Sequence, residues 1–478
     1  MEFREFIQHY EVLFYLVTVI CFVFGLKMLT SPKTARRGNL LSGIGMLVAI
    51  ATALLSRGVV DYTTILIVFA VGSVIGAVLA YAIDLRAIPQ MVAILNGFGG
   101  AVSALVGIAE LNAVVGGAAL APGMSPQLFF AAVGVDTFIG TLTFWGSMIA
   151  FAKLQGLISE KAYTLPLKNV INSLLLAGIV ALTVLLTLNS ANATDPTNLV
   201  YLVVILVLAS LLGLTLTMAV GGADMPIVIA LFISYAGLSA GALGFTNLNY
   251  GLIMVGALVG ASGLILTATM AKAINRNFWG IILGNITPPT MAVTGADDIY
   301  AGKIKSTNPE EFASILEAAQ TVCIVPGYGL AVAQAQSNCR DLYQELTAAG
   351  KDVWFAVHPV AGRMPGHMNV LLAEVDIPYD KLKELDDSNT MLSDCDVAII
   401  LGANDVVNPL ARTAKDTPIY GMPILDVDKA KTILVIKRSL SPGFSGIPNP
   451  LFILDQTLMI FKDAKPALAE LVKAYREL

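Results

Sequence analysis

The fold is decided by the stretch Thr321-Val-Cys-Ile-Val-Pro-Gly-Tyr-Gly-Leu-Ala-Val-Ala-Gln-Ala-Gln336, in which an apolar run meets two closely spaced glycines. The run predicts a short buried strand, Gly327 and Gly329 predict a tight turn, and a helix is expected from Leu330 to about Ala349. Such a junction suits a dinucleotide pyrophosphate, because glycine lets the backbone approach closely and the helix N-terminus offers free N–H groups. The pattern is incomplete, since Val332 replaces the third glycine of G-x-G-x-x-G.

The residues around this stretch alternate apolar runs with helical patterns, so 316–478 are predicted to form an α/β Rossmann-like domain with a doubly wound parallel sheet. Further strands are predicted at residues 352–358, 397–401, 418–425, 432–437 and 451–453, with a closing helix from Pro466. Residues 273–315 are predicted to be a connector in which a short helix opens at Pro309.

The first 272 residues have a different composition. The whole chain of 478 residues is 56% hydrophobic and only 13% charged, against about 25% charged in soluble proteins. Its long apolar runs predict a polytopic α-helical transmembrane domain, because about 20 apolar residues span a bilayer. About nine spans are expected, at residues 10–29, 39–56, 60–83, 89–110, 126–152, 168–188, 198–219, 224–244 and 248–272.

The basic residues between these spans predict the orientation. The loops on the side of the C-terminal domain contain Lys27, Lys33, Arg36, Arg37, Arg86, Lys153, Lys161, Lys168, Lys272 and Arg276. The loops on the other side contain Arg4 and Arg57. This bias predicts a multi-pass membrane protein with its C-terminal domain in the cytoplasm, or in the matrix if the protein is mitochondrial. The expected location is a bacterial cytoplasmic (inner) membrane. The first apolar run lacks a basic segment before it and an A-x-A site, so it is expected to stay as an anchor.

The membrane half contains an internal repeat. The segment from Ile88 to Gly100 resembles the segment from Met225 to Gly237, and the two helices are expected to run in the same direction. Repeats in membrane proteins often frame a translocation path, although chance similarity between helices rich in Gly and Ala is the alternative.

Three polar residues in or beside the spans are candidates for a proton path. Asn96 and Asp136 lie within predicted helices, and Asp224 lies at the start of another. Polar groups in a membrane interior are costly and often functional. The alternatives are a helix–helix hydrogen bond for Asn96 and a helix cap for Asp224.

Charge and cysteine usage exclude other classes of site. The net charge of −5 gives no indication of nucleic-acid binding. Four cysteines without C-x-x-C spacing and three histidines make a metal site unexpected and imply no disulfide framework.

The predicted second strand points to the type of nucleotide. An NAD site places Asp or Glu at the end of this strand, but here the strand ends Ala356-Val-His-Pro359. Lys437-Arg438-Ser439 follow a later strand, and two cations with a hydroxyl suit a 2′-phosphate. NADP is therefore favoured over NAD, with an ordinary solvated Lys-Arg pair as the alternative. Loops rich in Gly, Pro and Asn follow other strands, at 358–369, 402–409 and 443–450.

Together these motifs resemble the β subunit of proton-translocating NAD(P) transhydrogenases over essentially the whole chain. The similarity rests on Gly-Tyr-Gly-Leu-Ala-Val-Ala-Gln-Ala-Gln from Gly327, Val-Ala-Gly-Arg-Met-Pro-Gly-His-Met-Asn from Val360, Gly-Ala-Asn-Asp from Gly402, Gly-Met-Pro from Gly421, Lys-Arg-Ser from Lys437 and Gly-Gly-Ala-Asp-Met-Pro from Gly221.

The resemblance implies that hydride passes between NAD(H) on a partner α subunit and NADP(H) on this chain, coupled to proton movement. A dimer of the αβ unit in a lipid membrane is also implied. Residues 441–446 would form a lid over the nucleotide. The residues expected to bind NADP(H) are Gly327, Tyr328, Gly329, Val332, Val360, Ala361, Gly362, Arg363, Met364, Pro365, Gly402, Ala403, Asn404, Asp405, Val406, Gly421, Met422, Lys437, Arg438, Ser439, Gly443, Phe444, Asp463 and Ala464.

The chain departs from the family pattern at three positions. Some members have His in place of Asn96 and Asn in place of Ile233, and Tyr is usual in place of Phe444. Because an amide does not titrate near neutral pH, the identity of the proton-carrying group stays open. The alternative functions are a cation channel or transporter with a regulatory nucleotide-binding domain, and a membrane-anchored NADP reductase.

Overall fold

The computed structural model describes residues 9–29, 32–56, 62–83, 87–163, 165–273, 275, 277, 280, 300, 302–363, 366–417, 419–443 and 445–478. The chain divides into two compact units. The first comprises residues 1–220 and 228–266, and the second comprises residues 221–227 and 267–478. The domain limits predicted at residues 272 and 316 stay predictions.

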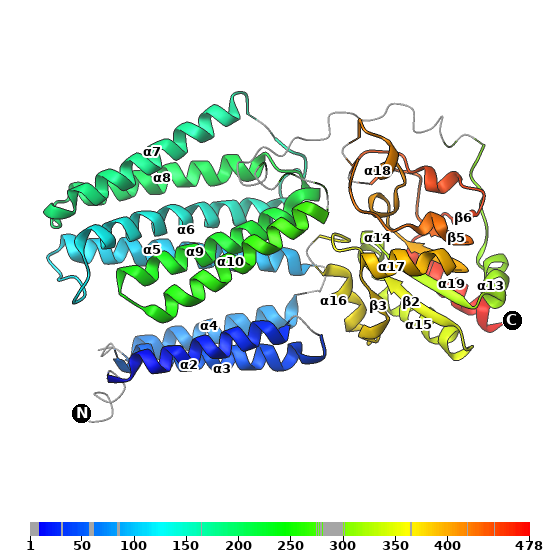
Figure 1. The fold of residues 1–478 in the computed structure, drawn as a ribbon, viewed down its shortest axis with the longest axis horizontal. Coiled ribbons are helices and arrows are strands. Elements are labelled where there is room, and N and C mark those ends of the chain that lie inside the picture. Colours follow the sequence, from blue (N-terminus) through cyan, green and yellow to red (C-terminus); the bar gives the residue numbers. More distant parts are fainter. Residues whose placement is uncertain are drawn as a thin grey trace. The chain divides into compact units, whose positions relative to one another are not determined.

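Long apolar helices make up the N-terminal part of the chain (Figure 1). They are α2 (Glu11–Leu29), α3 (Pro32–Ser56), α4 (Tyr62–Ala82), α5 (Ile88–Val115), α6 (Pro126–Leu154), α7 (Lys168–Leu188), α8 (Thr197–Met218), α9 (Met225–Thr246) and α10 (Tyr250–Ala273). Among the described residues, eight helices are long and apolar enough to cross a membrane, and α4 contributes a shorter apolar segment, Thr63–Leu79. This is the pattern of a multi-pass membrane protein, and the predicted class of the N-terminal part is confirmed.

Small residues bring α5 and α6 into close contact. A Cβ on Gly100 would lie 2.6 Å from the Gly140 carbonyl oxygen, and a Cβ on Gly140 would lie 2.6 Å from the Gly100 carbonyl oxygen. Only glycine fits at such a crossing, which is the usual way in which helices associate in lipid. The α6 helix begins at Pro126 after Ser125, whose hydroxyl accepts a hydrogen bond from the Leu128 N–H at 3.2 Å.

A buried lysine closes the C-terminal end of α8. Lys153, in the last turn of α6, is fully buried. Its ammonium donates to the carbonyl of Met218 at 2.8 Å and to that of Val220 at 2.6 Å. The last carbonyls of a helix have no partner within the helix and carry the negative end of its dipole. One cation therefore satisfies several buried acceptors and ties α6 to the end of α8.

Replacing Lys153 with Met should lower the stability of the membrane unit, because the freed carbonyls of Met218 and Val220 stay buried. The expected loss is about 1–3 kcal/mol, to be measured as a lower melting temperature of the full chain in detergent. Lys161→Met is the control, because Lys161 is an exposed residue. Equal melting temperatures for the two variants would contradict this role.

The second unit is built on a six-stranded sheet in which every neighbouring pair is parallel. Its order is β3-β2-β1-β4-β5-β6. The strands are β1 (Thr321–Pro326), β2 (Asp352–Ala356), β3 (Leu382–Lys383), β4 (Val397–Leu401), β5 (Thr432–Ile436) and β6 (Thr457–Ile460). The predicted doubly wound parallel sheet is confirmed.

Both faces of this sheet are buried. Alternate residues of the strands, such as Cys323, Ile400 and Val435, belong to a buried cluster with the η8 residues Leu451 and Phe452. The opposite face meets helix α15 (Gln336–Ala348), where the rings of Tyr343 and Phe355 lie 5.7 Å apart. The unit also contains helices α13 (Pro309–Ala318), α16 (His367–Glu374), α17 (Leu385–Met391), α18 (Leu410–Thr413) and α19 (Ala464–Arg476) (Figure 1).

Three sequence predictions are corrected by the structure. Residues 419–425 form turns and irregular backbone in place of a strand, and residues 450–453 form the 3-10 helix η8 (Pro450–Ile453). The last strand is β6, which was not predicted. The helix after the glycines is divided into α14 (Tyr328–Val332) and α15, because Gln334 adopts a left-handed φ of +49°.

Candidate nucleotide-binding edge of the sheet

The candidate site lies where the strand order reverses. Strand β1 has β2 on one side and β4 on the other, and ligands of open parallel sheets bind at the carboxyl end of such a switch point. The turns that follow β1, β2, β4 and β5 all leave the sheet at this edge. These turns contain most of the predicted NADP(H)-binding residues.

The turns after β1 and β4 pack backbone against backbone. The Gly327 N–H donates to the Leu401 carbonyl at 2.9 Å, and the Gly329 N–H donates to the Gly402 carbonyl at 3.0 Å. A Cβ on Gly329 would lie 2.6 Å from the Gly402 Cα, and Gly402 has a φ of +66°. Glycine is therefore required on both turns. Val332, at the position of the missing third glycine, is exposed.

The segment after β5 is hydrogen-bonded to the turn after β4. The Asp405 carboxylate accepts from the Ser445 hydroxyl at 2.6 Å and from the Ser445 N–H at 3.0 Å. The Asn449 side chain donates to the Asn404 carbonyl at 3.0 Å. Burial raises the pKa of Asp405, and the hydrogen bonds from Ser445 oppose the rise. A Cβ on Gly443 would lie 2.7 Å from the Asp405 carboxylate oxygens, so this segment lies directly against the β4 turn.

The side chains of Lys437, Arg438 and Ser439, which follow β5, lie in two different environments. The Lys437 ammonium lies 3.4 Å from the Asn404 side-chain oxygen and 5.2 Å from the centroid of the Phe452 ring. It also donates to the carbonyl of Ser441. Burial lowers the Lys437 pKa to about 8, with partial compensation by the charge of Asp405.

The next two residues of the triplet are exposed. Arg438 lies 3.5 Å from the Asp463 carboxylate, and the Ser439 hydroxyl donates to that of Ser441 at 3.0 Å. Both side chains of the ion pair are more than half exposed, so the pair adds little stability. Ala464, the first residue of α19, is buried next to Asp463.

Two buried histidines organise the turn after β2. His358 accepts from the Val360 N–H at 3.3 Å through Nδ1, so its Nε2 carries the hydrogen and donates to the Pro423 carbonyl at 2.9 Å. His367 accepts from the Arg363 N–H at 2.9 Å through Nδ1. Burial lowers the pKa of each histidine to about 4.

The same turn lies against Tyr328. The Arg363 guanidinium carbon lies 4.8 Å from the centroid of the Tyr328 ring, within the range of a cation–π contact. Gly362 has a φ of +107°, and a Cβ there would lie 2.5 Å from His367 Nδ1. Ala361 is buried beside it. The turns after β1 and β2 therefore meet through Arg363 and Tyr328.

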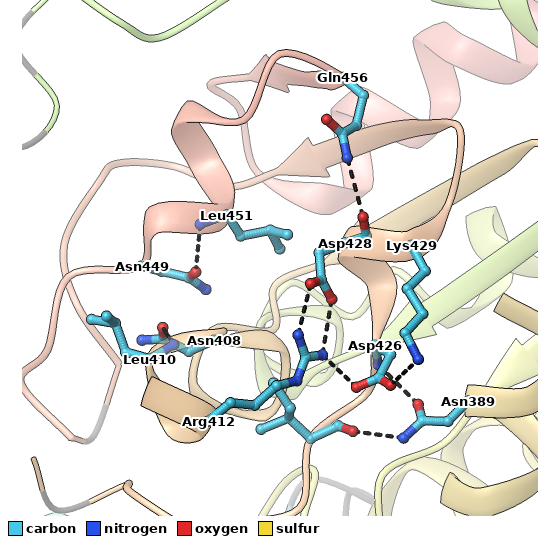
Figure 2. Close-up of polar contacts among 11 residues, drawn as sticks. Asn389, Asn408, Leu410, Arg412, Asp426, Asp428, Lys429, Asn449, Leu451 and Gln456 are labelled. Carbon is cyan, nitrogen blue, oxygen red and sulfur yellow. Dashed lines mark hydrogen bonds and ion pairs between the residues drawn. The ribbon is translucent and has the colours of Figure 1, made fainter. Parts of the chain in front are cut away.

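A charged cluster supports the loop between β4 and β5. Figure 2 shows that the Arg412 guanidinium binds Asp428 through two hydrogen bonds, of 2.7 and 2.9 Å, and also binds Asp426. Asn389 donates to the Ile424 carbonyl at 2.9 Å and accepts from the Asp426 N–H at 2.8 Å. Hydrogen bonding to Asp428 raises the Arg412 pKa. This cluster fixes the loop that contains the predicted site residues Gly421 and Met422.

Apolar contacts bring several predicted residues together. Met422 belongs to a small buried cluster with Ile447, against which Val360 and Val406 pack. Ala403 is buried in the main core, and Gly421, with a φ of +76°, donates its N–H to the Ala411 carbonyl at 2.8 Å. Met364, Pro365 and Phe444 lie outside the described residues.

The predicted proton-path residues lie on different helices. Asn96 of α5 donates to the Ser147 hydroxyl of α6 at 3.1 Å, and Asp136 of α6 is fully buried among hydroxyl groups. Asp224 ends the short 3-10 turn η3 (Gly222–Asp224) before α9 and is 6% exposed.

Sequence reasoning missed several polar residues of the candidate nucleotide-binding edge. Asn449, Ser445 and Tyr300 were not singled out, although the Tyr300 hydroxyl accepts from the Asn449 N–H at 2.7 Å. Asn449 lies between two prolines in a predicted ligand loop, and that context was the available signal. Tyr300 had none, because it lies in the predicted connector.

A set of apolar helices long enough to cross a membrane, followed by a doubly wound sheet with glycine turns at its switch point, defines a membrane protein with a dinucleotide-type domain. A family model described as NAD(P) transhydrogenase beta subunit matches residues 11–474. The NAD(P) transhydrogenase subunit beta of Rhodospirillum rubrum is 42% identical over 462 residues, which cover 96% of this chain and 98% of the relative. The same figures hold for the subunit from a defined strain of that species. The chain therefore belongs to the NAD(P) transhydrogenase beta subunit family.

Acidification should loosen the turn after β2, because His358 is neutral in the folded protein. Its folded pKa of about 4 lies below the ordinary value of 6.5, so the unfolded state binds the proton first and stability falls as pH drops from 6.5 towards 4. Hydrogen–deuterium exchange of residues 357–363 should show this loss of protection.

His358→Gln is the matched variant, because its amide can still donate to the Pro423 carbonyl but does not titrate. At each pH the wild type and the variant are compared directly, which removes the intrinsic pH dependence of exchange. A pH response of the same size in both proteins would exclude His358 as its cause.

Proposed function

We propose that this chain is the NADP(H)-binding, membrane-spanning subunit of an enzyme that transfers hydride between NAD(H) and NADP(H) and couples the transfer to proton translocation. In this reaction a hydride leaves NADH, which becomes NAD⁺, and joins NADP⁺, which becomes NADPH. Membership of the transhydrogenase beta subunit family supports the proposal. It also favours this function over the channel and reductase alternatives.

The choice of NADP(H) is supported by the ends of two strands. Strand β2 is followed by Val357 and the buried His358, with no carboxylate to accept a hydrogen bond from a ribose 2′-hydroxyl. Strand β5 is followed by the exposed Arg438 and Ser439. A guanidinium and a hydroxyl at this edge fit a 2′-phosphate. The choice of NADP(H) rests on one observation, the exposed Arg438 after β5.

An unpartnered donor at the start of α16 also fits a phosphate. His367 is 1% exposed, and its Nε2 has no hydrogen-bond partner among the described residues. Because Nδ1 accepts from the Arg363 N–H, Nε2 carries the hydrogen. Arg363 supplies a cation two residues after Ala361. These groups would hold the pyrophosphate together with the turn at Gly327–Gly329.

Bound NADP(H) would supply the hydride chemistry, and the chain would supply position and electrostatics. Asn404 and Asp405 would lie near the nicotinamide end, and the segment 441–446 would cover the nucleotide. The Asp405–Ser445 hydrogen bonds support a closed arrangement of this segment. Exchange of nucleotide requires an open arrangement of the same segment. Coupling then requires that proton binding favour either the open or the closed state.

The proposal includes a partner and a location. NAD(H) would bind an α subunit, the αβ unit would form a dimer, and the chain would lie in a bacterial inner membrane with the second unit in the cytoplasm. Asp224, just before α9 in the chain, would relay proton occupancy to the nucleotide-binding part.

Purified full-length chain should bind NADPH far more tightly than NADH in calorimetric titrations. Arg438→Ala should weaken NADPH binding about tenfold to hundredfold, the cost of a lost charge-assisted hydrogen bond, and leave the weak NADH affinity unchanged. Lys437→Ala should also weaken NADPH binding.

The control for these variants is Lys473→Ala, which removes a cation that is 77% exposed on α19. It should bind NADPH as the wild type does. Equal affinity of the wild type for NADPH and NADH, or no change in Arg438→Ala, would refute the assignment of the 2′-phosphate.

A further inference from the structure

Three polar residues are spaced by seven along α5. Asn96, Ser103 and Glu110 lie within Ile88–Val115, where the residues are otherwise mainly apolar or small. Seven residues are nearly two helical turns, so the three side chains share one face of α5. At about 1.5 Å of rise per residue, they are spread over about 21 Å of the helix, more than half of the roughly 30 Å hydrocarbon core of a bilayer.

Each of the three residues has a polar partner on a neighbouring element. The partners are Ser147 of α6 for Asn96, Asp136 of α6 and Ser239 of α9 for Ser103, and Asn247, just after α9, for Glu110. Asp136 and Ser147 are eleven residues apart, which again places them on one face of a helix. The polar face of α5 therefore contacts polar groups from α6 and from α9 with the residue that follows it.

The contacts of α5 with α9 follow the internal repeat. The hydroxyl oxygens of Ser103 and Ser239 lie 2.9 Å apart, and the Asn247 amide donates to the Glu110 carboxylate. The differences in residue number are 239 − 103 = 136 and 247 − 110 = 137. The repeat aligns Ile88 with Met225, a difference of 137. The two repeat helices thus run in parallel and meet near equivalent positions, which is where repeat-built transporters place their path.

Asp136 is the centre of this polar row. It is fully buried, and its Oδ1 accepts hydrogen bonds of 2.5 Å from both Ser103 and Ser239. Each hydroxyl has one hydrogen to donate, so two donors on one oxygen fit an ionised carboxylate. The other oxygen, Oδ2, is buried with no hydrogen-bond partner among the described residues.

The unpartnered oxygen lies against α5 at Gly107. A Cβ on Gly107 would lie 2.8 Å from Asp136 Oδ2 and 3.4 Å from the Thr137 hydroxyl. Gly107 lies between Ser103 and Glu110 on α5, and the charge of Glu110 acts on Asp136 through space. A side chain at position 107 would therefore collide with Oδ2, so the glycine leaves room for this oxygen between Ser103 and Glu110.

We propose that Asp136 is the proton-binding group of the membrane unit, held by Ser103 and Ser239, with Glu110 and Asn96 on either side of it along α5. The assignment rests on the proposed function. Asn96 is an amide and cannot titrate, so Asp136 takes the role of the titrating group. A hydronium ion transfers a proton to Oδ2: one of its O–H bonds breaks and leaves a water molecule, an O–H bond to Oδ2 forms, and the carboxylate becomes a neutral carboxylic acid. Release breaks the bond to Oδ2 and passes the proton to a water molecule on the other side, which becomes hydronium.

The spacing of the row requires water between its members. Neighbouring α5 residues are about 10 Å apart along the helix axis, which is too far for a direct hydrogen bond. Asn96 and Asn247 can each donate and accept, so they can orient such water without titrating. Only Asp136 and Glu110 in the row change charge. Asp136 has the deeper position, and Glu110 is partly exposed.

The test uses full-length chain reconstituted in vesicles with an NAD(H)-binding α chain. Asp136→Asn keeps the shape and the acceptor for both serines but cannot bind a proton. It should lose at least tenfold in the rate of vesicle acidification coupled to hydride transfer, while NADPH binding changes by less than twofold. Asp136→Glu should recover part of the coupled rate with a displaced pH profile.

Infrared difference spectra supply a readout that a merely structural role would not change. A band of a protonated carboxylic acid should appear on acidification of the wild type, disappear in Asp136→Asn and shift in Asp136→Glu. Should Asp136→Asn fail to fold, Ser103→Ala with Ser239→Ala keeps the carboxyl group and should displace the pH profile.

Thr215→Val is the matched control, because it removes a hydroxyl that donates to Asn172 at 2.7 Å between α8 and α7, away from the row. It should pump as the wild type does. Wild-type acidification in Asp136→Asn, or an unchanged carboxylic acid band, overturns the assignment alone. A wild type that transfers hydride without acidification overturns the proposed function, and the assignment with it.

Discussion

The candidate nucleotide-binding edge depends on one contact, the backbone-to-backbone packing of the turns after β1 and β4. Hydrogen bonds from Gly327 to Leu401, at the end of β4, and from Gly329 to Gly402 hold it together, and Gly327, Gly329 and Gly402 have no side chains that would keep the backbones apart. Strands β1 and β4 are direct neighbours in the sheet, so this contact fixes the point from which all the other site loops are positioned. The glycines that first indicated a ligand site are therefore needed by the protein itself before any ligand binds.

Two charged side chains at the same edge, Lys437 and Asp405, are partly shielded from water. Lys437 lies between Asn404 and the Phe452 ring, and burial lowers its pKa to about 8. Asp405 binds Ser445 and thereby holds the segment that would cover the nucleotide. A bound phosphate or a displacement of the Asp405 side chain would change the electrostatic interactions of Lys437 and Asp405, because both groups are partly desolvated. The edge thus has the electrostatic elements that a two-state nucleotide site needs.

The sequence predicts the long helices and the strands with continuous apolar runs, because the spacing of apolar residues indicates which side chains are buried. It does not predict β3, which has two residues, or the break at Gln334, where a residue other than glycine adopts a left-handed conformation. Residues 419–425 resemble a strand because Ile419, Met422 and Ile424 are buried, but they pack as a loop. Candidate site residues within one loop are adjacent in the sequence, so the sequence predicts that they lie together. The Asp405–Ser445 contact could not be predicted in this way, because it joins two loops that meet only in the folded structure.

The central claim, that hydride transfer on this chain is coupled to proton movement, is tested most directly by an imposed pH gradient. Vesicles containing this chain and an α chain are equilibrated with all four nucleotides, and the ratio of the NADP to the NAD couples is read with and without the gradient. If one proton moves per hydride, the ratio should shift about tenfold for each pH unit and return when a protonophore is added. An identical ratio with and without the gradient, in vesicles that transfer hydride, would contradict the claim.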